Sequence, residues 1–147
     1  MPRRTMEYTD FKQRFSSCPD LTELEVAPTA LLLWRSDEVV FRQGEIIYEE
    51  CAKLDNTFCL LLSGELLVEK GGTLIGQISE GQIFGEMAFF SPEHLRTATV
   101  RVGSGESTAL KIQLSPKELA TARLAVLKKY LGLRAWERFV SDAEQGL

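Results

Sequence analysis

Phe-Gly-Glu-Met-Ala-Phe-Phe, at residues 84–90, is the stretch that decides the fold, and Arg-Thr-Ala-Thr follows it at residues 96–99. Gly85 can let the backbone approach a ligand closely. The apolar run after it can start a short helix, whose first amides and positive dipole end favour an anion. Glu86 can accept hydrogen bonds from hydroxyls, and Arg96 offers a planar fork that fits a phosphate. The pattern predicts a site for a phosphate joined to a sugar.

A simpler interpretation of the same stretch is a buried strand over residues 83–90, with Arg96 in a solvated turn. Three other Gly-Glu dipeptides, at residues 44–45, 64–65 and 105–106, act as internal controls. None of them combines an apolar helix start with an arginine at the same distance. The combination therefore favours the ligand site.

Composition limits the class of function. The 147 residues suit one domain, and 44% hydrophobic with 26% charged residues is ordinary for a globular protein. The net charge of −4 argues against nucleic-acid binding, and no apolar run is long enough for membrane insertion.

Three cysteines without Cys-x-x-Cys spacing predict free thiols in a reducing, cytoplasmic setting, with Cys59 as a small core residue. The single histidine, His94, is expected in an exposed loop, and we expect no metal and no cofactor.

Short apolar runs separated by glycine turns fill the middle of the chain and indicate an antiparallel β-roll, jelly-roll-like in type, over residues 31–114. Residues 1–30 are predicted as an N-terminal helical segment with a short helix at 8–15, and residues 115–147 as C-terminal helices. The result is one mainly β domain, 1–147, with flanking helices. Strands are expected at residues 39–41, 46–48, 58–62, 66–68 and 108–114, with a hairpin turn at 70–73.

The C-terminal part begins with a clear helix signal. Ser115 and Glu118 form a capping-box pattern, and Pro116 stands at the first helical position. The apolar pattern then predicts one helix that ends at Gly132, which would act as a hinge, and a second, shorter helix after it.

Residues 84–99 resemble the phosphate-binding cassette of cyclic nucleotide-binding domains, the β-roll modules of the bacterial catabolite activator protein and of cyclic-nucleotide-dependent kinases and channels. The resemblance runs from about Glu38 to about Leu119, and the spacing of ten from Glu86 to Arg96 matches the bacterial members. It implies a roll with a short phosphate-binding helix and cAMP or cGMP as the ligand. The ligand-binding residues that it implies are Phe84, Gly85, Glu86, Met87, Ala88, Arg96, Thr97 and Ala98.

The resemblance also implies a role for each group. Gly85 would permit close backbone approach, and the amides that follow Glu86 would hold the cyclic phosphate. Arg96 would pair with the exocyclic oxygens, and Glu86 would accept the ribose 2′-hydroxyl. Thr97 could bond the phosphate or the edge of a purine. Threonine here often accompanies guanine in the family, which leaves the choice between cAMP and cGMP open.

We therefore expect a regulatory sensor without catalytic residues that binds a cyclic nucleotide and acts on an unidentified protein effector, with a homodimer as an open alternative. The sequence lacks an evident effector, so the chain is expected to be either a stand-alone sensor or a fragment; a start at Met1 and a C-terminus that looks like a helix end favour the stand-alone sensor. An enzyme on a similar roll, such as a cupin, would need several histidines on a metal. A roll that binds no nucleotide and serves as a protein-interaction scaffold is the other alternative.

Four C-terminal side chains could close over the base as a lid, or could pack permanently on the roll: Leu131, Leu133, Trp136 and Phe139.

Overall fold

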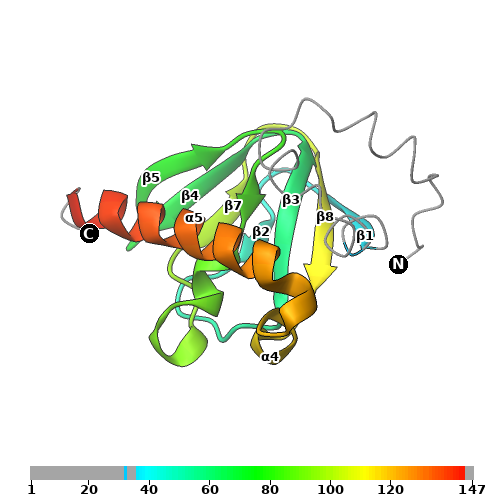
Figure 1. The fold of residues 1–147 in the computed structure, drawn as a ribbon. Coiled ribbons are helices and arrows are strands. Elements are labelled where there is room, and N and C mark those ends of the chain that lie inside the picture. The colour runs from blue at the N-terminus through cyan, green and yellow to red at the C-terminus, as the bar shows by residue number, and fades with distance from the viewer. Residues whose placement is uncertain (1–31, 33–35, 145–147) are drawn as a thin grey trace.

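The computed structural model describes residue 32 and residues 36–144, so the predicted N-terminal helical segment lies outside the described residues. Within this part, eight strands pair antiparallel in two four-stranded sheets, ordered β1-β8-β3-β6 and β2-β7-β4-β5 (Figure 1). The expected mainly β roll with C-terminal helices is thereby confirmed. The strands are β1 Asp37–Phe41, β2 Ile46–Tyr48, β3 Thr57–Ser63, β4 Leu66–Lys70, β5 Thr73–Ile78, β6 Ile83–Phe84, β7 Thr99–Val102 and β8 Ser107–Gln113.

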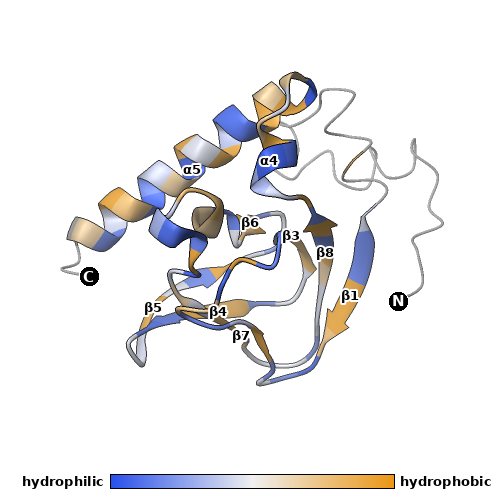
Figure 2. Ribbon diagram, turned by 90° about the horizontal axis from the view of Figure 1, so that it is seen from below, coloured by the Kyte–Doolittle hydropathy of each residue, from blue (hydrophilic) through white to orange (hydrophobic). Residues whose placement is uncertain are grey.

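Short helical turns interrupt the roll, and one long helix lies across it. In Figure 2 this helix, α5, runs along one side of the roll, with β1 on the far side. None of the helices in the described part of the chain is long and apolar enough to cross a membrane. The helical elements are η1 Glu86–Phe89, η2 Pro92–His94, α4 Pro116–Leu119, η3 Ala122–Leu124 and α5 Ala125–Glu144.

Strand β3 is buried on both faces, because one face meets the interior of the roll and the other meets the helices. Side chains alternate across a strand. Cys59 and Leu61 accordingly point into the roll beside Phe84 and Val100. Phe58, Leu60 and Leu62 point outward and pack with Phe89, Leu110, Ile112, Leu127 and Leu131. The outward cluster anchors both η1 and α5 to the same sheet.

Gly85 ends strand β6 and turns the chain into η1. Its φ of 86° lies in the left-handed region, which glycine adopts without strain. The alternative of a continuous buried strand over residues 83–90 is therefore wrong. Arg96 keeps only 4% of its surface exposed, so the solvated turn that this alternative required is absent too.

The capping box at Ser115 is confirmed: Ser115 Oγ accepts from the amide of Glu118, and Glu118 Oε1 accepts from the amide of Ser115. The helix nevertheless ends at Leu119, because Thr121 takes up an extended conformation. The predicted stop and hinge at Gly132 is wrong, since α5 continues through it without interruption. Good helix formers surround Gly132, and a single glycine costs a helix only about 1 kcal/mol.

Gly132→Ala tests the continuity of α5. A Cβ at this position would lie 3.6 Å from Phe90 Cε1, an ordinary contact. We expect the substitution to raise the free energy of unfolding by about 0.4–1 kcal/mol, because alanine restricts the unfolded chain and favours the helix. Urea unfolding measures the change. A loss of stability would mean that residue 132 needs the conformational freedom of a hinge.

Candidate functional site

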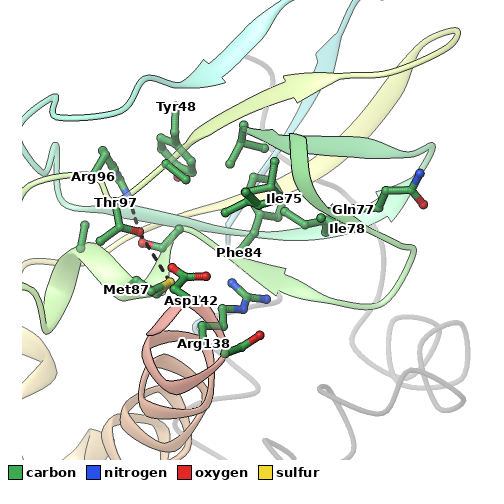
Figure 3. Close-up of a pocket in the computed structure, with 17 residues that line it drawn as sticks. Tyr48, Ile75, Gln77, Ile78, Phe84, Met87, Arg96, Thr97, Arg138 and Asp142 are labelled. Carbon is green, nitrogen blue, oxygen red and sulfur yellow. Dashed lines mark hydrogen bonds between the residues drawn. The ribbon is translucent and has the colours of Figure 1, made fainter. Parts of the chain in front are cut away.

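A cavity of about 280 Å³ lies between strand β5, the turn at Gly85 and the inner side of α5 (Figure 3). Figure 3 shows Tyr48, Arg96 and Thr97 at one end and Ile75, Gln77 and Ile78 at the other, with Arg138 and Asp142 directed into the space from α5. The lining residues are Tyr48, Val68, Ile75, Gly76, Gln77, Ile78, Phe84, Gly85, Met87, Ala88, Arg96, Thr97, Ala98, Val100, Arg138, Ser141 and Asp142.

The Arg96 guanidinium group is the most buried cation at the site. Its Nη1 donates to the carbonyl of Gly85 at 2.8 Å, and its Nη2 donates to the carbonyl of Thr57 at 2.8 Å. Nη2 also forms a salt bridge with Asp55 Oδ1 at 2.7 Å. These contacts hold the turn before η1 against the start of β3, so a single side chain fixes the geometry of this end of the cavity.

Tyr48 lies directly under Arg96, with the guanidinium carbon 3.7 Å from the ring centre. This is a cation–π contact in a buried setting. The Tyr48 hydroxyl is within hydrogen-bond distance of Thr57 Oγ1 at 2.9 Å and of Cys59 Sγ at 3.3 Å. Burial raises the pKa values of both Tyr48 and Cys59, that of Cys59 to about 11, so both groups stay neutral beneath the arginine.

Asp55 balances the charge of Arg96 from the loop before β3. Burial alone would raise the pKa of its carboxyl. The hydrogen bond from Thr57 at 2.6 Å and the neighbouring Arg96 outweigh that effect, and the pKa lies below its usual value. Asp55 is therefore ionised at neutral pH.

Glu86 is fully buried, and a residue from the far end of the chain holds it. Arg138 Nη1 in α5 donates to Glu86 Oε1 at 2.7 Å, and Arg138 Nη2 donates to the carbonyl of Ile83 at 2.8 Å. A buried carboxylate needs a partner of opposite charge. Arg138 thus ties α5 to the first residue of β6 by a hydrogen bond and to the first residue of η1 by an ion pair.

The geometry and the sequence point to the same family. The sequence profile of the cyclic nucleotide-binding domain family matches residues 38–116, more than half of the chain. The chain belongs to this family. The resemblance stated from residues 84–99 is thereby confirmed. A search of curated proteins finds no match.

Solved structures share the fold of this cyclic nucleotide-binding domain at low sequence identity. A cAMP-bound PfPKA-R structure has a TM-score of 0.77 and 20% identity over 95% of this chain and 48% of its own, so the present chain spans about half of its length. The structure of Sp-2Cl-cAMPS bound to PKAR CBD2 has a TM-score of 0.77 and 20% identity, and the match covers 95% of this chain and 92% of that one. The sensor domain of the transcriptional regulator DNR from Pseudomonas aeruginosa has a TM-score of 0.67 and 19% identity, and the match covers 94% of this chain and 91% of that one.

Most residues of the predicted cassette meet at the cavity: Phe84, Gly85, Met87, Ala88, Arg96, Thr97 and Ala98 line it, and Glu86 contacts the lining residue Arg138. Thr97 Oγ1 lies 3.5 Å from Met87 Sδ, which places it beside the start of η1. His94 is exposed and lies outside the lining, with its Nδ1 3.1 Å from the carbonyl of Ala88. In the described part of the chain, no cluster of three or more His, Cys, Asp or Glu residues could hold a metal ion.

The predicted lid residues do not line the cavity. Leu131 is buried in the core against β3, Leu133 and Trp136 are exposed, and Phe139 is half-buried. The part of α5 that reaches the cavity carries Arg138, Ser141 and Asp142 instead, because the uninterrupted helix places residues three and four apart on one face. Sequence reasoning missed these polar residues, along with Tyr48 and the β5 wall.

Gly85→Ala tests how closely the backbone must pack here. A Cβ at residue 85 would lie 2.6 Å from Tyr48 Cε2 and 3.2 Å from Arg96 Nη1, whereas Gly44, with a similar φ of 81°, has nothing within 4 Å. Both substitutions carry the strain of a positive φ. Only Gly85→Ala adds overpacking, so its free energy of unfolding should fall by about 1–3 kcal/mol more than that of Gly44→Ala. Equal losses in urea unfolding would contradict the close contact.

Asp55→Asn tests the charge balance at Arg96 through pH. The pKa of Asp55 is below 3.8 in the folded chain, so its ionised form stabilises the fold above that pH, and this contribution is lost as the pH falls through the folded pKa. The variant should be less stable than the parent at pH 7, and the difference should narrow as the pH falls below 3.8. Urea unfolding at several pH values measures both, with the exposed Glu106→Gln as a control. A difference that does not change with pH would exclude the charge as its cause.

Proposed function

We propose that this cyclic nucleotide-binding domain binds a purine 3′,5′-cyclic nucleotide, cAMP or cGMP, and acts as a regulatory module without catalysis. The observation that carries the proposal is the cavity, which has a buried arginine and a glycine turn at one end and apolar walls at the other. Its volume of about 280 Å³ is near the lower end of the usual range for small-molecule sites, about 300 Å³.

The phosphate would bind beside Arg96. Three of the five N–H groups of its guanidinium are directed to Gly85, Asp55 and Thr57, while Nε–H and one Nη1–H have no protein acceptor among the described residues. A preorganised arginine with donors remaining is well suited to phosphate oxygens. Because residue 85 has no side chain, the phosphate can approach the backbone at the start of η1.

The sugar and base would extend toward β5 and α5. Glu86 contacts the lining residue Arg138, and a carboxylate can accept a ribose 2′-hydroxyl in addition to this bond. Val68, Ile75 and Ile78 offer apolar surface for a purine ring. Asp142, whose carboxylate is 3.7 Å from Lys70 Nζ, and Thr97 offer polar groups for its edge.

Two structural relatives and the position of α5 support the proposed regulatory role. One relative is named as PKAR CBD2 bound to Sp-2Cl-cAMPS, and another is the sensor domain of a transcriptional regulator. In this chain, the helix that contributes Arg138 and Asp142 to the cavity also has an outer face in solvent, so a change at the ligand can alter the surface that an effector contacts. The alternative, a roll that acts as a scaffold without a nucleotide, is the outcome that the experiment must exclude.

Isothermal titration with cAMP, cGMP, 5′-AMP and 5′-GMP is the decisive experiment. We expect one cyclic nucleotide to bind, and the comparison of cAMP with cGMP identifies the base. Saturation at one hundred times the dissociation constant should stabilise the fold by about 2.7 kcal/mol. If neither cyclic nucleotide binds at millimolar concentration, nucleotide binding is refuted and the scaffold alternative is favoured.

Arg96 should dominate the affinity. Arg96→Lys keeps the charge but loses the fork, and we expect the dissociation constant to rise at least about 30-fold, since loss of a buried charged hydrogen bond costs about 2–5 kcal/mol. Arg101→Lys is the matched control, because Arg101 bonds Glu69 on the neighbouring strand and does not line the cavity. Circular dichroism verifies that both variants fold. Unchanged affinity in folded Arg96→Lys would refute the assignment of the phosphate to Arg96.

A further inference from the structure

The face of α5 that points away from the roll carries large apolar side chains. Val126, Leu133 and Val140 follow one another at intervals of seven residues and are 45%, 54% and 37% exposed. Trp136, between the last two, is 67% exposed. On the opposite side of the helix, Leu127, Leu131 and Ala135 are almost completely buried. A helix that belonged only to this roll would be expected to present polar residues outward.

Two opposite charges flank this apolar row symmetrically. Lys129 lies four residues before Leu133 and Glu137 lies four residues after it, and both are exposed. At about 100° of rotation per residue, both lie within about 40° of Leu133 on the helix surface. We define the outer stripe as Val126, Lys129, Leu133, Trp136, Glu137 and Val140.

We propose that the outer stripe pairs with the outer stripe of a second copy of this chain, antiparallel, about a two-fold axis at Leu133. Leu133 then meets its own counterpart, and Val126, seven residues before it, meets Val140, seven residues after it. Lys129 of each copy lies at the level of Glu137 of the other, which forms two symmetric ion pairs. Such a self-complementary contact is the usual basis of a two-fold dimer.

Charge selects the antiparallel direction. In a parallel pair, Lys129 would face Lys129 and Glu137 would face Glu137, so like charges would repel at both positions. In the antiparallel pair, each Lys129 faces a Glu137 and attracts it, and such a juxtaposition of opposite charges fixes the register of helical partners. Within its own helix, Glu137 has only Arg134 at 3.7 Å and keeps 65% of its side chain exposed, so it remains available for a partner.

The pairing does not depend on the proposed nucleotide, because the outer stripe and the cavity lie on different sides of α5. The first experiment therefore uses the full chain without a nucleotide. Sedimentation equilibrium from micromolar to near-millimolar concentration should show a monomer–dimer equilibrium. Leu133→Ser should weaken the dimer at least about tenfold. Leu74→Ser is the matched control, since Leu74 is 55% exposed on β5 and lies outside the stripe, and it should change nothing.

Charge reversal tests the direction. Lys129→Glu and Glu137→Lys should each weaken the dimer by about tenfold, because each variant replaces both symmetric ion pairs with pairs of like charge that repel. The double variant should restore the parent affinity. A parallel dimer would respond to neither reversal, and this result would overturn the pairing. A chain that stays monomeric at all concentrations, or a dimer that Leu133→Ser and Leu74→Ser weaken equally, would overturn the surface itself.

Discussion

The buried guanidinium group of Arg96 is the constraint on which the site depends. A permanent charge can remain in the interior only if it is paired and hydrogen-bonded. Arg96 meets this need with the Asp55 carboxylate, the carbonyls of Thr57 and Gly85, and the face of the Tyr48 ring. These partners come from separate parts of the roll, so satisfying one charge also holds together β2, the start of β3 and the turn before η1.

A second buried charge connects the roll to the helix. Glu86 is fully enclosed and is held by Arg138, which is fifty-two residues further along the chain. Removing one partner of such a pair leaves an uncompensated buried charge, which is strongly unfavourable. The position of α5 is thus coupled to the start of η1. Its apolar packing through Leu127 and Leu131 fixes the near end of the helix, and the ion pair fixes the segment over the cavity.

The predictions that held were those with a local physical cause. The β-roll was expected from short apolar strands between glycine turns, and the described residues form it. The capping box at Ser115 formed because its two hydrogen bonds join residues three apart. The hinge at Gly132 failed because helix propensity is weak compared with packing along the whole of α5. The four residues expected as a lid do not line the cavity, since one continuous helix carries all of them, and Leu131 packs in the core instead.

The sequence alone determined the family and the roll, because the spacing from Glu86 to Arg96 and the alternation along each strand are local properties of the chain. Only the tertiary structure decided which residues complete the site. Tyr48, the β5 wall and Arg138 contain no motif that assigns them to one cavity, and they meet there because sheet pairing and helix docking bring distant segments together. No motif assigns Asp55 to the charge of Arg96 either, yet the fold brings the two together. The same docking decided which face of α5 is buried, because a helix with apolar residues on two sides can bury only one of them against a single roll.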